Sequence, residues 1–276
     1  MSLVVESAGL TDVGKKRKNN EDSFFLDDGL GLYVVADGMG GHQAGEVASK
    51  IVVETMRDYL RSVSADLKAE ALPDTDMALS REANRLLSSI HLANRSIHQV
   101  AEKKESLHGM GSTVSAVYLA DDRLVAANVG DSPIYLIHEG EIETISVFHT
   151  VIEEQKAINP EAAGQLGEKF AHMLTRAMGV EETVLPDVCE VQVFPGDVLV
   201  IGSDGLTNMV NEEEIRDVAM KNRPEVACQA LVDLANERGG GDNITVIVLR
   251  VKSVDNHENG LWGLFVRAVK RLFEPI

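Results

Sequence analysis

Residues 31–38 read GLYVVADG, an apolar run that ends in an Asp-Gly pair. Its β-branched and aromatic residues, flanked by Asp and Gly, are typical of a buried strand. Three more apolar runs lie beside the same kind of pair, namely Gly130-Asp131 after residues 124–129, Asp204-Gly205 after residues 198–203, and Gly241-Asp242 before residues 244–251. The sequence therefore places four carboxylates at strand ends, where glycine lets the backbone turn tightly.

Outward from this strand, the pattern predicts two long helices and then further strands. Apolar residues recur at helical spacing over 44–63 and over 76–104, and Pro73-Asp74 marks the break between them. Two shorter helices are expected, one capped by Asn211 and one over 224–238. Short apolar segments predict strands at 23–26, 31–36, 112–119, 124–129, 134–137, 141–145, 188–194, 198–202 and 244–251. Strands and helices do not alternate, so the order predicts an α+β fold of mostly antiparallel sheets with helices packed outside.

The composition is that of a globular chain with a strongly acidic surface. The chain has 276 residues, 44% of them hydrophobic, which suits one large domain with a sizeable core. Its 26 basic residues against 44 acidic ones give a net charge of −18, which argues against nucleic-acid binding. We see no signal peptide and no apolar run of about 18 residues, so we expect a cytoplasmic protein. Cys189 and Cys228 are far apart in sequence and are expected to be reduced.

The four carboxylates have an ordinary and a chemical interpretation. A single Asp-Gly pair is most often a plain turn. These pairs, however, adjoin the most hydrophobic strands of the chain, whose ends are a common place for active sites. Four carboxylates that converge repel one another unless a cation lies between them. Oxygen ligands without Cys or suitably spaced His favour Mg²⁺, Mn²⁺ or Ca²⁺ over Zn²⁺.

The segment before the first predicted strand adds charges of both signs. Glu21 and Asp22 lie just before that strand, and Arg17 carries a planar fork of donors that matches the oxygens of a phosphate. Taken alone, the basic run 15–18 is more often a solvated turn. Beside an acidic cluster, in so acidic a chain, Arg17 instead indicates a site for phosphoryl chemistry.

The loop 37–46 is rich in glycine but lacks both nucleotide-binding patterns, G-x-G-x-x-G and G-x-x-x-x-G-K-[ST]. Its glycines are better explained by a backbone that approaches a metal closely, with the Gly38 carbonyl oxygen as a candidate ligand. His42 is a candidate acid or base, although a single loop histidine is more often a bystander.

Seven motifs follow one another along residues 8–251: Thr11-Asp12-x-Gly14-x-x-Arg17-x-Asn19-Asn20-Glu21-Asp22-Ser23, Val35-Ala36-Asp37-Gly38-Met39-Gly40-Gly41-His42, Gly111-Ser112-Thr113, Asn128-Val129-Gly130-Asp131-Ser132, Leu174-Thr175-Arg176-Ala177, Ser203-Asp204-Gly205-Leu206-Thr207 and Asp242-Asn243-Ile244-Thr245. In this order they resemble the metal-dependent type 2C (PPM) Ser/Thr protein phosphatases, in particular their bacterial branch. The resemblance implies a four-layer α-β-β-α sandwich that binds two Mn²⁺ or Mg²⁺ ions and hydrolyses phosphoserine and phosphothreonine in proteins.

The same resemblance implies roles for particular residues. The ligands of the two ions would be Asp37, which bridges them, together with Gly38, Asp204, Asp242 and Glu21, the last directly or through water. Asp131 with Asp204 matches the position of a third, weaker ion. Arg17 matches the phosphate-binding arginine, so Arg17 and Asp37 are expected to be catalytic. Since a bridging water would attack phosphorus directly, neither cysteine is expected to matter for catalysis.

Some positions depart from the family pattern. Met39 stands where animal members carry a His proposed as general acid, although the bacterial branch shares this Met. Pro133 stands where Arg is usual, and Phe148-His149-Thr150 where the bacterial pattern often reads Asp-His-Ser. We therefore expect an atypical flap, about residues 146–172, which bears on substrate preference more than on chemistry.

The last residues differ in character from the rest. We expect residues 1–251 to form the phosphatase domain, and 252–276 to form a linker and an amphipathic tail. Within 260–276, apolar residues recur at helical spacing opposite three basic residues. This tail either packs back on the domain or touches a partner or a membrane surface.

Three functions are compatible with these sequence features. The first is a phosphatase that reverses the action of a Ser/Thr kinase on a phosphorylated protein. The second is a phosphatase-fold regulatory or binding module that docks through its tail. The third is a hydrolase of small phosphoesters. The intact metal positions favour the first, for which we expect a phosphoprotein substrate, a cognate kinase, no nucleic acid and a monomer.

Overall fold

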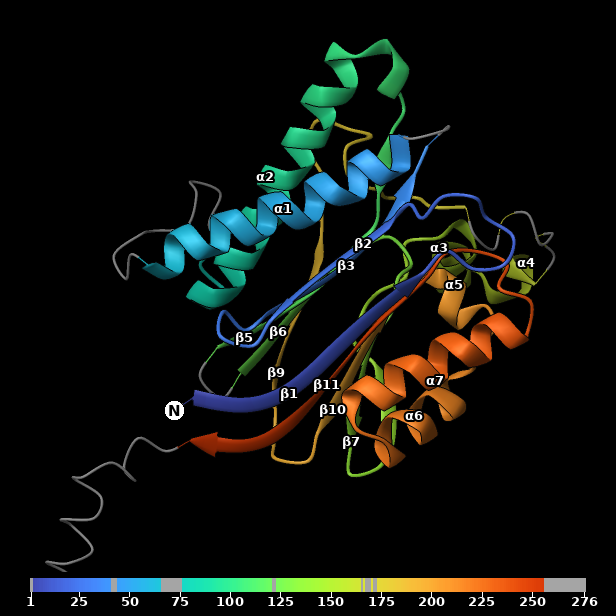
Figure 1. Ribbon diagram of the computed structural model, residues 1–276. Helices are drawn as coiled ribbons and strands as arrows, with labels where there is room; N and C mark the ends of the chain where they lie inside the picture. The colour runs from blue at the N-terminus through green and yellow to red at the C-terminus, as the bar shows by residue number, and fades with distance from the viewer. Residues whose placement is uncertain are drawn as a thin grey trace, which may run out of the picture.

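The computed structural model describes residues 2–40, 44–65, 76–120, 123–164, 166, 170 and 173–255. Two antiparallel sheets pack face to face, and helices cover both outer faces (Figure 1). The first sheet has the order β1 (Ser2–Asp12), β11 (Ile244–Asp255), β10 (Val198–Gly202), β7 (Ile134–His138) and β8 (Glu141–Thr144). The second has the order β2 (Asp22–Asp27), β3 (Leu32–Met39), β5 (Val114–Ala120), β6 (Arg123–Val129) and β9 (Asp187–Gln192), with β4 (Gly111–Ser112) paired to the end of β3. The predicted four-layer α+β architecture is confirmed.

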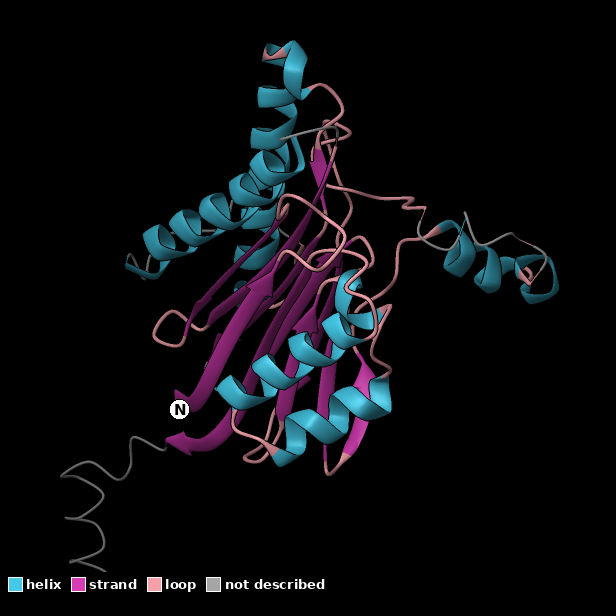
Figure 2. Cartoon of the chain, turned by 45° about the vertical axis from the view of Figure 1, so that its right-hand side comes forward, coloured by secondary structure: helices cyan, strands magenta, loops and turns pink. Residues whose placement is uncertain are grey.

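The helices fall into two groups that cover different sheets (Figures 1 and 2). The long pair α1 (Ala44–Ala65) and α2 (Arg81–Lys103) packs on the second sheet. The pair α6 (Glu212–Lys221) and α7 (Pro224–Glu237) packs on the first sheet. Shorter helices are η1 (Glu105–Leu107), α3 (Val151–Ile158), α4 (Pro160–Ala163) and α5 (Asp204–Thr207). Figure 2 shows α3 and α4 set apart from the sheets.

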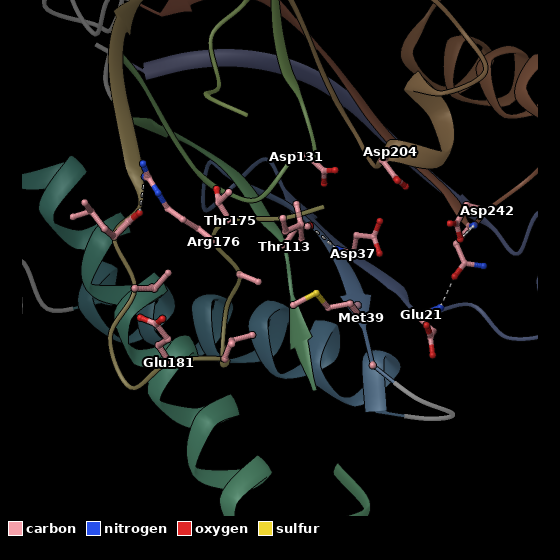
Figure 3. Close-up of a pocket in the computed structure, with 18 of the residues that line it drawn as sticks. Glu21, Asp37, Met39, Thr113, Asp131, Thr175, Arg176, Glu181, Asp204 and Asp242 are labelled. Atoms are coloured by element: carbon pink, nitrogen blue, oxygen red, sulfur yellow. Dashed lines mark hydrogen bonds between the residues drawn. The ribbon is translucent and has the colours of Figure 1, made fainter. Parts of the chain in front are cut away.

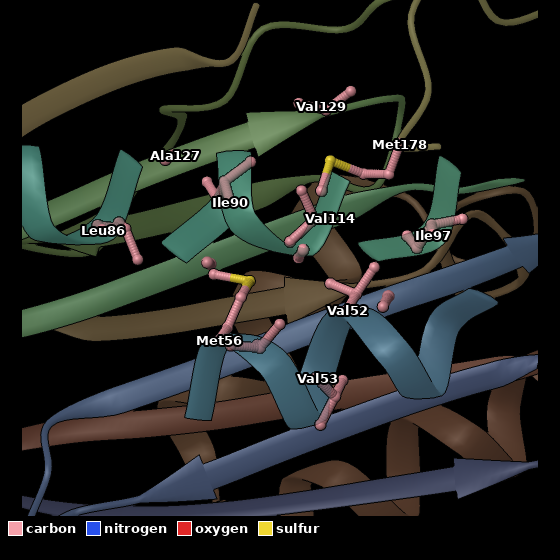
Figure 4. Packing of buried hydrophobic residues seen from close by; sticks show 14 of the residues in the cluster. Val52, Val53, Met56, Leu86, Ile90, Ile97, Val114, Ala127, Val129 and Met178 are labelled. Carbon is pink, nitrogen blue, oxygen red and sulfur yellow. The ribbon is translucent and has the colours of Figure 1, made fainter. Parts of the chain in front are cut away.

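Strand β3 explains why the sandwich holds together. Side chains alternate across a strand, so Leu32 and Val34 face α1 and α2 while Tyr33 and Val35 face the other sheet. Both faces of β3 are therefore buried, which is why its sequence is an unbroken apolar run. Between α1, α2 and the second sheet the core is mainly aliphatic (Figure 4). This packing holds the ends of the central strands in fixed positions.

Several predicted boundaries need correction. The second helix begins at Arg81 rather than residue 76, because the Ser80 hydroxyl caps it by accepting from the Ala83 amide at 3.0 Å. Asn84 holds the preceding turn instead, through its amide to the Asp76 carbonyl oxygen at 2.9 Å. The predicted strand 112–119 is split in two at Thr113.

Two strand features were not anticipated. Strand β1 was not predicted at all, and the last strand runs four residues beyond 251, to Asp255, where it pairs with β1.

Within the described part of the chain, no helix combines the length and apolarity that a bilayer crossing needs. Pro73-Asp74, His42 and the tail 260–276 lie outside the described residues, so the predictions about them stay predictions.

Candidate metal centre

The four Asp-Gly carboxylates meet at one end of the sandwich. Asp37 belongs to β3, Asp131 follows β6, Asp204 begins α5 after β10, and Asp242 precedes β11. Together with Glu21 they line one cavity of about 930 Å³. Figure 3 shows the four aspartates near one another, with Glu21 at the same side of the cavity. Both sheets thus contribute carboxylates to a single site.

All seven residues expected in the site from the sequence line this cavity. They are Arg17, Glu21, Asp37, Gly38, Asp131, Asp204 and Asp242. Arg17 forms an ion pair with Asp242 in which the Nη2–Oδ2 distance is 2.6 Å. The expected group is therefore brought together in space.

Glycine is required where the backbones approach most closely. A Cβ at Gly38 would collide with the carbonyl oxygen of Gly45, and a Cβ at Gly205 would collide with that of Asn243. Neither contact could be relieved by moving a flexible side chain, since the obstacles are backbone atoms. The Asp-Gly pairs at Asp37 and Asp204 thus serve tight packing around the cavity and not only a turn.

The negative charge of the cavity is poorly compensated. Burial, together with the charges of Asp22, Asp204, Asp242 and Asp131, raises the pKa of Asp37 well above its ordinary value. Burial also raises the pKa of Glu21, against the opposing effect of Arg17. Two arginines line the cavity, but Arg176 is paired with Asp187. Arg17 alone cannot neutralise the five clustered carboxylates, so the site favours a bound cation.

Asp22 is a further buried acid that the sequence placed near the site but not in it. Its Oδ2 accepts hydrogen bonds from Ser203 Oγ at 2.8 Å and from Thr245 Oγ1 at 2.6 Å. Its Oδ1 is buried without a hydrogen-bond partner among the described residues. Burial raises the pKa of Asp22, with Asp204 adding to the effect. Through these bonds Asp22 joins β2 to the opposite sheet, close enough to Asp204 and Asp242 to feel their charges.

Asn243 and Thr113 hold the acidic segments in place. Asn243 Oδ1 accepts from the Glu21 amide at 2.8 Å, and its Nδ2 donates to the carbonyl oxygens of Val13 and Asn19, both at 2.9 Å. Thr113 Oγ1 accepts from the Asp37 amide at 3.0 Å. The motifs contained both residues, but only the fold shows which main-chain groups they bind.

The opposite wall of the cavity comes from the segment 174–185, which carries Arg176 and Glu181 (Figure 3). Here Val180 and Leu185 are exposed, at 53% and 71% of their surface. Asn94 of α2 holds this segment, because its Oδ1 accepts from the Gly179 amide at 2.7 Å and its Nδ2 donates to the Glu181 carbonyl oxygen at 3.1 Å. No periodicity marks residues 179–185, so they could not be assigned to the site before the fold was known.

The chemistry of the donors fits Mn²⁺ or Mg²⁺. All the acidic groups offer oxygen, and the Gly38 carbonyl adds a neutral oxygen. Among the described residues, no three His, Cys, Asp or Glu side chains stand close enough to hold an ion as they are. An ion would therefore draw carboxylates inward or complete its shell with water, as Mg²⁺ usually does. Cys189 and Cys228 are free thiols, and neither lines the cavity.

Comparisons with known proteins agree with this geometry. The sequence model of protein phosphatase 2C matches residues 14–233. The serine/threonine phosphatase stp of Listeria welshimeri is 36% identical over 87% of this chain and 93% of its own. The Mycobacterium tuberculosis serine/threonine phosphatase PstP/Ppp superposes with a TM-score of 0.78 at 30% identity, covering 91% of this chain and 100% of that one.

A second solved structure bears on the cavity. It is the catalytic domain of the serine/threonine protein phosphatase PstP in complex with two manganese ions, which matches with a TM-score of 0.76 at 31% identity over 91% of this chain and 100% of that one. Sequence motifs, fold and relatives agree over most of the chain. The chain therefore belongs to the protein phosphatase 2C family and is a serine/threonine protein phosphatase related to bacterial members.

Proposed function

We propose that this chain uses its acidic cavity, loaded with two Mn²⁺ or Mg²⁺ ions, to hydrolyse phosphoserine and phosphothreonine in a protein that a Ser/Thr kinase has phosphorylated. The observation that carries the proposal is the gathering of Arg17 and all six expected ligand residues around one cavity. The four aspartates come from four separate strand ends, and a chance cluster would be costly because like charges repel.

The ligand roles follow from the donor chemistry. Asp37, half-buried at the end of β3, would be shared between two ions, with Gly38, Glu21, Asp204 and Asp242 as the other ligands. Asp131 with Asp204 would bind a third ion more weakly. Bound divalent ions supply an activated water at neutral pH and neutralise charge that develops on the phosphoryl oxygens.

Arg17 would bind and orient the phosphate. Its bond to Asp242 uses only Nη2, so donors on Nη1 and Nε are not engaged by any hydrogen bond within the described residues. The neighbouring carboxylates raise the pKa of Arg17, with the hydrogen bond to Asp242 as the largest cause, so the guanidinium stays charged. A planar cation beside the acids can hold two phosphoryl oxygens at once.

The shape of the cavity favours a protein substrate over a small phosphoester. The site continues from the carboxylates along the segment 174–185, where Val180 and Leu185 present apolar surface. A small phosphoester would leave this wall unused, whereas residues on either side of a phosphorylated side chain would reach it. The alternative of a regulatory or binding module that docks through its tail, with catalysis secondary, is less favoured because every expected ligand lies at the cavity.

Phosphate release from a phosphothreonine peptide tests the proposal. The assay compares the wild-type chain in Mn²⁺, in Mg²⁺ and in EDTA with Asp204→Asn, and uses Asp217→Asn as the matched control. Asp217 is a half-exposed surface residue of α6 that pairs with Arg216 and Lys221. We expect metal-dependent release, a loss of at least about a hundredfold for Asp204→Asn and little change for the control. Release that is unaffected by EDTA, or no release from a folded wild-type chain, would contradict the proposal.

A further inference from the structure

His149 lies between the cavity wall and the loop that carries Asp131. It is buried, with 1% of its surface exposed, and directly precedes the Thr150 cap of α3. Its Nδ1 accepts a hydrogen bond from the Gly130 amide at 3.0 Å, and its own amide donates to the Gly130 carbonyl oxygen at 3.0 Å. Both main-chain polar groups of Gly130 are therefore held by this one residue.

These contacts determine the tautomer of the ring. The Gly130 amide can only donate, so Nδ1 must carry a lone pair, and the proton of the neutral ring lies on Nε2. Nε2 is 2.7 Å from Asp187 Oδ2, an acceptor suited to that proton. Nη1 of Arg176 donates to the same Oδ2 at 2.7 Å and lies 3.2 Å from Nε2, a contact between two donors and not a hydrogen bond in this tautomer.

The other side of the ring is joined to the cavity wall. Arg176 lines the cavity and also contacts the Leu185 carbonyl oxygen at 3.3 Å. The Thr175 amide donates to the His149 carbonyl oxygen at 2.9 Å, so the wall is tied to His149 through the main chain as well. A continuous set of hydrogen bonds thus runs from the wall, through Asp187 and His149, to the Asp131 loop.

Gly130 is the position in that loop where an external support matters most. Its φ is +106°, and a Cβ there would lie 2.6 Å from Thr113 Cγ2. Only glycine fits, so Gly130 has no side chain with which to anchor itself. The orientation of the next residue, Asp131, depends on the groups that bind the Gly130 main chain.

We propose that His149 is a positioning residue for Asp131, which it orients toward the cavity by holding the Gly130 peptide groups, with Asp187 and Arg176 fixing the ring from the cavity wall. This inference rests on the proposed role of Asp131 in binding an ion. It implies that the N-terminus of α3 and the wall 174–185 both influence the position of Asp131 through the His149 side chain.

The first test uses the wild-type chain and requires neither metal nor activity. Nitrogen NMR of the histidine rings distinguishes a bare Nδ1 from a protonated one, and hydrogen exchange reports on the Gly130 amide. We expect His149 to be the Nε2–H tautomer, with slow exchange at Gly130. A protonated Nδ1, or rapid exchange at Gly130, would overturn the proposal whatever the enzyme does.

The second test compares two substitutions that each keep half of the ring's contacts. His149→Asn places Oδ1 where Nδ1 lies and so keeps an acceptor for the Gly130 amide. His149→Gln places its amide group where Nε2 lies, near Asp187, and removes the acceptor for the Gly130 amide. His138→Asn is the control, because His138 also pairs with an aspartate, Asp197 at 2.7 Å, but lies outside the site. Melting curves establish that each variant is folded.

We expect His149→Gln to raise the Mn²⁺ concentration for half-maximal activity about tenfold, while His149→Asn and the control stay within about threefold of wild type. An equal loss in both His149 variants, or a lower kcat with no change in Mn²⁺ dependence, would overturn a positioning role. If the wild-type chain needs no metal, the proposed function fails, and the NMR result still decides the His149–Gly130 contact.

Discussion

At the residue scale, the decisive feature is a cluster of acids that the fold forces together. The apolar strands that precede Asp37 and Asp204 are buried, so their ends cannot move apart to relieve the repulsion. The sequence was sufficient to predict this convergence, because a carboxylate beside glycine recurs at four strand ends. It was not sufficient to show how Asp22 joins the opposite sheet or the contacts of Asn243, since a hydrogen-bond partner more than 180 residues away leaves no local signal.

The raised pKa of Asp37 predicts how the metal-free chain responds to pH. In the folded state this carboxyl keeps its proton to a higher pH than in the unfolded state, so stability falls as pH rises above the ordinary pKa of Asp near 4. Asp37→Asn removes the ionisable group, and with it the free-energy cost of ionising this carboxyl in the folded chain. We expect it to raise the unfolding free energy of the metal-free chain at pH 7.5 by about 1–3 kcal/mol, and by much less at pH 4.

Urea unfolding in EDTA at both pH values measures this difference, with Asp217→Asn as the surface control. Because the ions would offset the repulsion only in the wild-type chain, added Mn²⁺ should reverse the order of stability. A metal-free Asp37→Asn variant that is less stable than wild type at pH 7.5 would show that the carboxylate is not under electrostatic strain.

At the scale of elements, sequence reasoning succeeded where one physical signal dominates. The helix beginning after Asn211 has the capping box that its sequence predicts, with Asn211 Oδ1 accepting from the Glu214 amide at 3.0 Å. Strand β1 was missed because it is an edge strand whose residues are mostly half-buried, so its apolar pattern is weak. Residues 76–80 continue the apolar stripe of α2, but the Ser80 cap starts the helix only at Arg81, and the Asn84 side chain holds the turn that precedes it.

The wall formed by the segment 174–185 gives a prediction about substrate choice. Leu185 is exposed at the cavity, so Leu185→Asp removes apolar contact and adds charge without disturbing the core. We expect the KM for a phosphothreonine peptide with apolar flanking residues to rise about tenfold, with kcat within a factor of about two. The kinetic constants for p-nitrophenyl phosphate should be nearly unchanged, because that ester does not extend to the wall.

Val226→Asp is the matched control for this substitution, as Val226 is similarly exposed, at 54%, but lies on α7. Equal losses with the peptide and with p-nitrophenyl phosphate would mean that Leu185 affects the metal centre and not the peptide. If the kinetic constants for both substrates stay unchanged, the wall 174–185 does not contribute to substrate choice.

At the scale of the whole molecule, the sandwich brings together segments that are far apart in sequence. Residues near 17–22, 37, 131, 204 and 242 meet because the ends of strands from both sheets lie at one edge, and helices on the outer faces keep the strands buried. The net charge of −18 makes Arg17 all the more dependent on metal ions for holding a phosphate. The order of the motifs predicted this arrangement, whereas the network through His149 required the fold.

The most direct test of the central claim is a calorimetric titration of the metal-free chain with Mn²⁺, for wild type, Asp37→Asn and Asp217→Asn. We expect at least two ions for wild type and for Asp217→Asn, and the loss of tight binding in Asp37→Asn, because that carboxylate would be shared between the ions. A folded wild-type chain that binds no Mn²⁺, or an Asp37→Asn variant that binds as many ions as tightly as wild type, would contradict the claim.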